Sequence, residues 1–361
     1  MSRLFGRNWS KQDLMERVGD ASQLGGIRNV TLNDGNENGV RAVEVCTGSG
    51  LRFTVLPDRG MDILDAEFSG RSLCWRSSTG AVAPSFFEPI GPGWLRGFFG
   101  GLLTTCGLSY VGPADIDEGE VLGVHGRASY IPARDVCTDC RWDGDEYLMS
   151  VRGRVTETSS LGPRVTLTRN ISSKLGANSL SIDDTIENEG YLTSPFTMLY
   201  HINLGFPVVS KDAILLSPTR NVTNIAGEAI TQIDQYRRFD DPQAETQEGV
   251  FCHEMVPDEQ GYVTAALITR KPNPFGVFVR YRMKELPLLW EWRMLRRGVY
   301  VVALEPANCR PEERSKSRKR GDLKFLRPGE VVRHHVEIGV CTSEEEIATL
   351  ERHISGATTG P

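Results

Sequence analysis

The strongest constraint in this sequence is a series of short β-rich stretches with almost no helical periodicity between them. Examples are VRAVEV (residues 40–45), RVTLTRNISS (164–173), FGVFVRYR (275–282) and VYVVALE (299–305). Clusters of Gly, Pro, Asn and Asp separate most of these stretches, as is typical of strands joined by turns. So many strands without intervening helices predict an all-β fold, an antiparallel sandwich or barrel, rather than βαβ units.

Helices are predicted only near the two ends of the chain, at residues 10–18 and 343–353. Ser10 and Ser343 are suitable N-cap residues, and each is followed three positions later by an acidic residue, as in a capping box. No linker, low-complexity tract or fixed-period repeat divides the sequence between them. We therefore predict a single domain over residues 1–361, with the β-sandwich core at residues 25–342.

Composition narrows the classes of partner. A hydrophobic content of 39% in 361 residues is enough to build one large core. The net charge of −6 disfavours a surface that binds nucleic acid. The one basic run, RSKSRKRGDLK at residues 314–324, is more typical of a solvated loop than of a phosphate contact. We therefore expect no nucleic-acid partner.

Two further sequence features concern location and metals. The first twenty residues are polar and charged, and no run approaches the roughly 18 apolar residues that a membrane helix requires, which predicts a cytoplasmic protein without a membrane partner. Cys137 and Cys140 form one CxxC, but no second pair stands at zinc-site spacing. We expect no cofactor and no metal from this motif.

The segment at residues 77–129 differs from the rest, because it is dense in Gly, Pro and aromatic residues and follows neither structural period. Long irregular segments inside a compact domain are uncommon and often functional. We predict that it forms one wall of a site. It contains His125, in LGVHGRAS, where a turn would let the side chain point into a cleft.

Five other residues could carry chemistry or binding. His201 lies in an apolar strand, FTMLYHINLGFP, and by itself would more often be a core histidine. Glu305 ends the buried stretch VYVVALE, although carboxylates are rarely buried without a partner or a function. Arg59, in LPDRGMDI, could pair with a neighbouring aspartate or contact a ligand. Trp290 and Trp292 share one face of a strand, and an indole ring can stack on a sugar ring.

Together these stretches resemble the galactose mutarotase-like superfamily, and within it the aldose 1-epimerase-like branch. The resemblance is carried, over about residues 50–340, by LPDRGMDI, LGVHGRAS, MLYHINLGFP, LWEWRM, VYVVALEPANCRP and LRPGEVVRHHVEIGV. It implies an antiparallel β-supersandwich with a sugar-binding cleft on its concave face. Three features depart from the family's pattern: Tyr200 replaces the asparagine before the histidine, the aromatic residue after the histidine is missing, and Pro306 replaces the threonine after the glutamate.

The same resemblance implies roles for individual residues. His201 corresponds to the general acid and Glu305 to the general base, while His125 and Arg59 correspond to substrate contacts; Trp290 is a candidate stacking surface. A carboxylate and a protonated imidazole in one cleft can move protons at a sugar hydroxyl and ring oxygen. We therefore predict a carbohydrate isomerase that interconverts sugar anomers without a cofactor.

Two alternatives remain open from the sequence. The same groups could abstract a proton next to a carbonyl, as in a keto-sugar epimerase, isomerase or lyase, and His125, His201 and Glu305 could then bind a divalent metal. The chain could also be a non-catalytic sugar-binding module, because sandwich folds carry many functions. The predicted partner in each case is a small sugar, and the sequence leaves homo-oligomerisation open.

Overall fold

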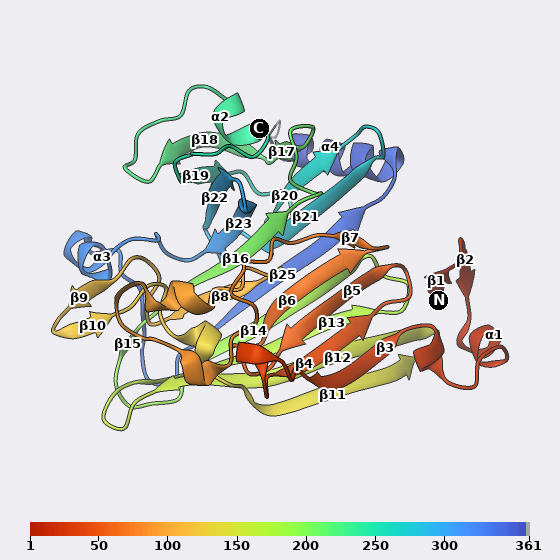
Figure 1. The fold of residues 1–361 in the computed structure, drawn as a ribbon, viewed down its shortest axis with the longest axis horizontal. Helices are drawn as coiled ribbons and strands as arrows, with labels where there is room; N and C mark the ends of the chain where they lie inside the picture. The colour runs from red at the N-terminus through yellow and green to blue at the C-terminus, as the bar shows by residue number, and fades with distance from the viewer. Residues whose placement is uncertain (359–361) are drawn as a thin grey trace.

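Three antiparallel sheets make up most of the protein in the computed structural model, which describes residues 1–358 (Figure 1). This confirms the predicted all-β class. The first sheet has five strands in sequence order: β3 (Gly26–Thr31), β4 (Arg41–Cys46), β5 (Leu51–Leu56), β6 (Asp62–Phe68) and β7 (Arg71–Ser72).

The two larger sheets are built from segments distant in the chain. The eight-stranded sheet runs in the order β11 (Arg134–Asp143), β12 (Glu146–Thr158), β13 (Arg164–Lys174), β14 (Ser179–Asn188), β25 (Val331–Cys341), β21 (Phe275–Arg282), β20 (Tyr262–Thr269) and β17 (Ile214–Leu216). The six-stranded sheet runs in the order β18 (Thr219–Asn224), β19 (Gly249–Met255), β22 (Leu288–Arg296), β23 (Val299–Ala307), β16 (Thr197–Gly205) and β8 (Thr104–Leu108).

Smaller elements sit around these sheets. The two-stranded pairs are β1 (Ser2–Leu4) with β2 (Arg7–Trp9), β9 (Asp115–Asp117) with β10 (Glu120–Leu122), and β15 (Ser194–Pro195) with β24 (Phe325–Leu326). The helices are α1 (Lys11–Met15), α2 (Asp234–Arg237), α3 (Arg314–Arg320) and α4 (Glu344–Thr358), with short 3₁₀ turns η1 (Ala21–Gln23), η2 (Gly35–Glu37), η3 (Pro84–Phe86), η4 (Gly91–Gly97) and η5 (Ala128–Tyr130).

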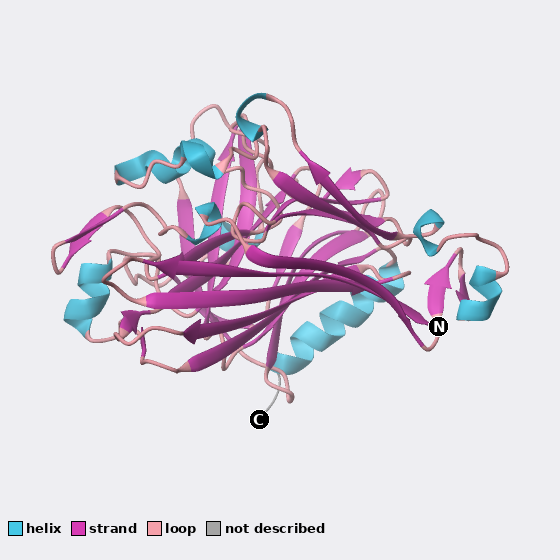
Figure 2. Cartoon of the chain, turned by 90° about the horizontal axis from the view of Figure 1, so that it is seen from below, coloured by secondary structure: helices cyan, strands magenta, loops and turns pink. Residues whose placement is uncertain are grey.

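One continuous hydrophobic core takes side chains from all three large sheets, for example Phe53 of β5, Leu167 of β13 and Ile202 of β16. Figure 2 shows the long strands layered over one another. In β14, burial alternates along the strand, because only one face packs into the core. In β16 every residue is buried. The second face of β16 is therefore covered by something other than the main core.

The terminal helices follow the predicted capping but not the predicted lengths. Ser10 and Asp13 form the reciprocal capping box at α1, which ends at Met15 after a single turn rather than at residue 18. The backbone N–H of Glu346 donates to the Ser343 hydroxyl at the start of α4. This helix continues to residue 358 and packs on β20 and β21 (Figure 1). No helix within residues 1–358 is long and apolar enough to span a membrane.

The prediction that the basic run forms a solvated loop is wrong for its first part, which forms α3. The β9–β10 hairpin next to it is acidic, and this charge holds the helix in place. The buried Arg314 donates through Nε to Asp117, at 2.6 Å, and through Nη2 to Glu120, also at 2.6 Å. Arg318 donates to Asp117 as well. The charges of Arg314 and Arg318 are therefore compensated within the protein.

A fully buried ionic cluster lies between the sheets, behind β16. The Arg169 guanidinium donates to Asp184 Oδ2 at 2.7 Å and to the Thr105 hydroxyl at 2.7 Å, and lies 3.3 Å from Asp62 Oδ1. The Tyr200 hydroxyl donates to Asp184 Oδ2 at 2.7 Å. Since Tyr200 precedes His201 and pairs with Thr105 across the sheet, the cluster fixes the backbone of β16 against β8, β13 and β14.

Asp62 should make the stability of the protein depend on pH. Burial raises the pKa of Asp62 to about 6, against the opposing attraction of Arg169. The folded state therefore binds the proton more tightly than the unfolded chain, so this contribution to stability is complete below about pH 4 and is lost as pH rises through about 6. As pH rises from 4 to 7, the free energy of unfolding of an Asp62→Asn variant should rise by on the order of 2 kcal/mol relative to that of the parent protein. Urea unfolding of both proteins across this range measures the difference, and a difference that does not change with pH would contradict the prediction.

Candidate active site

The register between β16 and β23 brings together the two residues predicted as acid and base. Ile202 pairs with Leu304 and Asn203 with Ala303, which sets His201 directly opposite Glu305. Nε2 of His201 lies 3.0 Å from Oε1 of Glu305, and only 7% and 4% of the two side chains are exposed. Successive residues of a strand face opposite sides, so Tyr200 and Ile202 enter the main core while His201 faces away from it.

Aromatic rings enclose the histidine on this second face. The ring centre of His201 lies 5.3 Å from that of Phe98, 5.4 Å from Trp292 and 6.2 Å from His125. Trp94, from η4, packs at 4.9 Å against His125. Trp94, Phe98 and His125 all belong to residues 77–129, so this segment does cover the outer face of β16. The acid–base pair is therefore shielded from bulk water.

A tight backbone arrangement positions His125. The residue has a positive φ of 55°, its N–H donates to Gly112 O at 2.8 Å, and its carbonyl accepts from Gly107 N–H at 3.1 Å. The next residue, Gly126, has φ of 75°, and a Cβ there would lie 2.5 Å from the carbonyl oxygens of Gly107 and Tyr110. Only glycine fits at this position, which explains the HG pair in the sequence.

The protonation state of His125 follows from its surroundings. Burial of the ring lowers the pKa of His125 to about 3, and His201 contributes in the same direction. The imidazole is therefore neutral at physiological pH, with one nitrogen that donates and one that accepts a hydrogen bond. Such a group is suited to a sugar hydroxyl, which also donates and accepts.

Several buried polar atoms around the pair have no hydrogen-bond partner in the described chain. They are Nδ1 of His125, Nδ1 of His201, Oε1 of Glu305 and Oδ1 of Asn203. Oε1 of Glu305 is near His201 Nε2 but not aligned with it for a hydrogen bond. Buried polar groups are normally satisfied, and leaving one unpaired costs about 1–3 kcal/mol. Because the side chains of His125, His201 and Glu305 lie next to one another, their unpaired atoms indicate a site for a ligand that supplies several polar groups.

Arg59 is not brought into this site, contrary to the substrate contact implied by the sequence. It is fully buried and donates from Nε to Ser129 O at 2.7 Å, from Nη1 to Val82 O at 2.7 Å and from Nη2 to Gly97 O at 2.9 Å. Its guanidinium also lies 4.0 Å from the ring centre of Tyr130. Arg59 therefore holds together the loops that carry the aromatic residues around His201, and it presents no surface to a ligand.

The stacking residue also differs from the prediction. Trp290 is 1% exposed, and its indole N–H donates to the Cys309 carbonyl at 3.1 Å, so it packs beneath the site as part of an apolar cluster. Trp292, two residues along the same face of β22, is the indole that contacts His201. Its own N–H donates to Glu248. The sequence identified the face of the strand but not which of the two rings reaches His201.

The other site residues were not singled out from the sequence. Trp94 and Phe98 could be found only as members of an aromatic-rich segment, and Asn203 only by its i+2 relation to His201. Within residues 1–358, no three or more His, Cys, Asp or Glu side chains are gathered as metal ligands. Cys137 and Cys140 lie three positions apart on β11, so their side chains point to opposite faces and do not converge.

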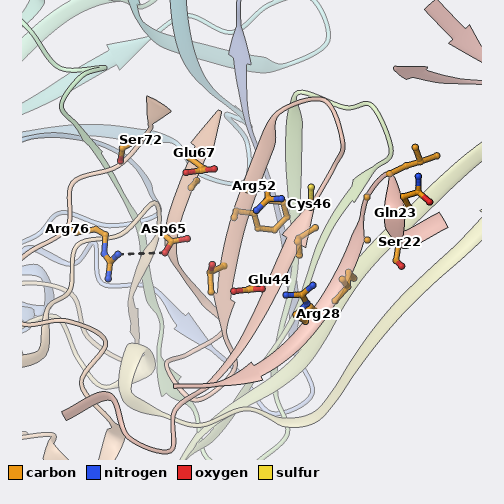
Figure 3. Close-up of a pocket in the computed structure, with 18 residues that line it drawn as sticks. Ser22, Gln23, Arg28, Glu44, Cys46, Arg52, Asp65, Glu67, Ser72 and Arg76 are labelled. Carbon is orange, nitrogen blue, oxygen red and sulfur yellow. Dashed lines mark ion pairs between the residues drawn. The ribbon is translucent and has the colours of Figure 1, made fainter. Parts of the chain in front are cut away.

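An open hollow of about 790 Å³ lies elsewhere, over the five-stranded sheet (Figure 3). Its floor is a ladder of charged side chains, in which Arg28 pairs across the strands with Glu44, and Arg52 with Glu67. Neither a histidine nor the Glu305 carboxylate lines it. It has the volume for a ligand but lacks an acid–base pair, so the surroundings of His201 and Glu305 are the better candidate site.

Comparison with protein families gives one match, and it covers most of the chain. Residues 37–340 match the family model described as "Domain of unknown function (DUF4432)". The chain belongs to the DUF4432 family. Comparison with curated proteins finds no match.

Solved structures show that this DUF4432 protein has the fold of galactose mutarotase-like proteins. A candidate aldose 1-epimerase from Klebsiella pneumoniae subsp. pneumoniae has a TM-score of 0.86 and 23% identity, with 94% of this chain and 90% of that chain covered. A galactose mutarotase-like protein from Clostridium acetobutylicum has a TM-score of 0.61 and 12% identity, with coverage of 89% and 100%. Galactose 1-epimerase from Lactobacillus acidophilus has a TM-score of 0.59 and 14% identity, with coverage of 89% and 100%.

Proposed function

We propose that this DUF4432 protein is a carbohydrate isomerase that interconverts the two anomers of a sugar. The observation that carries the proposal is the 3.0 Å contact between His201 Nε2 and Glu305 Oε1 inside an aromatic enclosure. The fold it shares with galactose 1-epimerase supports the proposal but does not decide the chemistry, because one fold hosts many reactions.

The pair can carry out both proton transfers of anomerisation. Glu305 removes the proton from the C1 hydroxyl while the protonated His201 donates one to the ring oxygen, and the C1–ring oxygen bond breaks to give the open-chain aldehyde. Rotation about the C1–C2 bond presents the other face of the aldehyde. The ring-oxygen hydroxyl then attacks C1 as His201 takes its proton back and Glu305 returns a proton to the new C1 hydroxyl.

The surrounding residues have distinct tasks in this reaction. His125 is neutral and offers a hydrogen bond to a ring hydroxyl, and the free Oδ1 of Asn203 accepts another. Trp292 and Phe98 supply flat apolar surfaces against the C–H face of the sugar. Because these rings exclude water, the charges that develop during proton transfer interact strongly with Glu305 and His201.

The test is anomer exchange in a Glu305→Gln variant, measured by exchange NMR on a panel of free aldoses. Glutamine keeps the shape of the side chain but cannot accept the hydroxyl proton, so exchange should fall roughly 10²–10⁴-fold. Glu67→Gln, an exposed carboxyl in the hollow of Figure 3, is the matched control and should exchange sugars like the parent protein. Unchanged exchange in an active Glu305→Gln protein would reject the proposal.

The same samples separate anomerisation from the alternative chemistry next to a carbonyl. Anomerisation moves only O–H protons, so in D₂O no deuterium should enter a C–H position of the sugar. Proton abstraction next to a carbonyl would instead exchange that C–H for deuterium. Protein that binds a sugar but changes neither its anomers nor its isotopes would indicate a binding module.

A further inference from the structure

A second histidine–glutamate pair lies on the opposite side of the six-stranded sheet. Trp290 and Trp292 of β22 face the candidate active site, so Glu291 between them faces the other way, as does His253 of β19. Nε2 of His253 lies 3.0 Å from Glu291 Oε2 in hydrogen-bonding geometry, and both side chains are 0% exposed. This pair is separated from the first by the thickness of the sheet.

The partners of this pair determine the tautomer of the histidine. Glu291 accepts from Arg293 Nε at 2.9 Å on its other oxygen, so both carboxylate oxygens act as acceptors and the negative charge is compensated. Nε2 of His253 must therefore carry the proton that Glu291 accepts. In a neutral imidazole this leaves Nδ1 as an acceptor. Nδ1 lies 3.2 Å from the hydroxyl of Thr219, whose single proton can be donated to it or to Met255 Sδ at 3.4 Å.

The Thr219 end of this chain of contacts from Glu291 through His253 opens to the surface. Thr219 lines a hollow of about 400 Å³, together with Ser217, whose hydroxyl lies 2.6 Å from that of Thr219. Tyr236 and Arg237 of α2 form another side of this hollow. Arg237 uses Nε to donate to Leu215 O at 3.2 Å and makes no ion pair among the described residues. Its remaining N–H groups can face negative charge that develops in the hollow.

We propose that Thr219, His253 and Glu291 form a second reactive site, in which Thr219 accepts an acyl group from a small carboxylic ester. The arrangement has the hydroxyl–imidazole–carboxylate order of nucleophilic catalysis, with the hydroxyl and the base within hydrogen-bonding distance and the base oriented by a carboxylate. Neither the sugar chemistry proposed above nor the fold requires a hydroxyl at the end of a buried His–Glu pair. This site does not depend on the function proposed for His201 and Glu305.

The acyl transfer balances with water as the only co-reactant. Nδ1 of His253 takes the Thr219 proton as Oγ1 attacks the ester carbonyl, and Arg237 stabilises the oxyanion. The alkoxide leaves with the proton from Nδ1, which gives an alcohol and acyl-Thr219. Water then attacks the acyl group by the same steps and releases the carboxylic acid and free Thr219.

The test uses the full chain and a fluorophosphonate probe, with the modified residue located by mass spectrometry, and hydrolysis of p-nitrophenyl acetate as a second readout. We expect a single label on Thr219, lost in Thr219→Val, with ester hydrolysis lowered roughly 10²-fold or more. Ser217→Ala is the matched control, since it removes the neighbouring hydroxyl from the same hollow, and it should still be labelled on Thr219.

The outcomes that would overturn the proposal are equally specific. Absence of label from the unmodified protein, or a label on Ser217, would reject Thr219 as the nucleophile. Equal ester hydrolysis in the unmodified protein and a folded Thr219→Val protein would mean that Thr219, His253 and Glu291 only hold β18, β19 and β22 together. The labelling of unmodified protein requires no variant, so the test remains decisive even where Thr219→Val does not fold.

Discussion

Replacement of His201 by asparagine is expected to lower the rate of anomer exchange roughly 10²–10⁴-fold, the usual effect of removing a general acid. Asparagine keeps a hydrogen-bonding group near Glu305 but cannot deliver a proton to the sugar ring oxygen. The measurement is turnover per folded molecule, taken beside a melting curve. His353→Asn is the matched control, because 44% of the His353 side chain is exposed and it pairs with Asp258 away from the site.

A histidine that served only the core would behave differently. Its loss would leave a buried partner unsatisfied and cost about 1–3 kcal/mol of stability, with little change in turnover per folded molecule. A His201→Asn protein that melts early but exchanges anomers at the parent rate would therefore remove His201 from the mechanism. The pH profile gives a second check: a pair that needs one ionised base and one protonated acid produces a bell-shaped rate curve, and the variant should lose one limb of it.

Replacement of Arg169 by methionine is expected to destabilise the protein by about 3–5 kcal/mol, the cost of leaving buried charges without a partner. Asp184 and Asp62 both face this guanidinium, and all three side chains are fully buried. Chemical denaturation measures the loss. Lys174→Met is the surface control, because Lys174 and Glu146 are half exposed, and its cost should not exceed about 1 kcal/mol.

A double variant tests the cause of this effect. Asp184→Asn added to Arg169→Met removes one of the two uncompensated charges, so the double variant should be more stable than Arg169→Met alone. Simple addition of two separate losses would mean that the residues act independently, which their 2.7 Å contact does not support. Because Tyr200 also hydrogen-bonds to Asp184, we expect the rate of anomer exchange to fall together with the free energy of unfolding.

The sequence by itself determined the class of fold and the two residues at the centre of the candidate site. Strand-length apolar stretches separated by turn residues leave few architectures open, and the antiparallel sheets follow from them. Ser10 and Ser343 gave the starts of the terminal helices, since capping depends on residues three positions apart. Local patterns of this kind are complete within a few residues, so they can be read without tertiary structure.

Only the tertiary structure decided which side chains meet. The contact between His201 and Glu305 depends on the register of β16 against β23, and a shift of one residue would turn either side chain into the core. Alternation placed Trp290 and Trp292 on one face, but the covering segment decides that Trp292 reaches His201 and that Trp290 is buried.

Arg59 lies in a motif that suggests a ligand contact, yet three carbonyls of distant loops surround its guanidinium. His253 carried no signal in the sequence, because its partners Glu291 and Thr219 come from other strands. The period of a strand fixes the face of a side chain, whereas its neighbours depend on strand pairing and loop packing between segments distant in the chain.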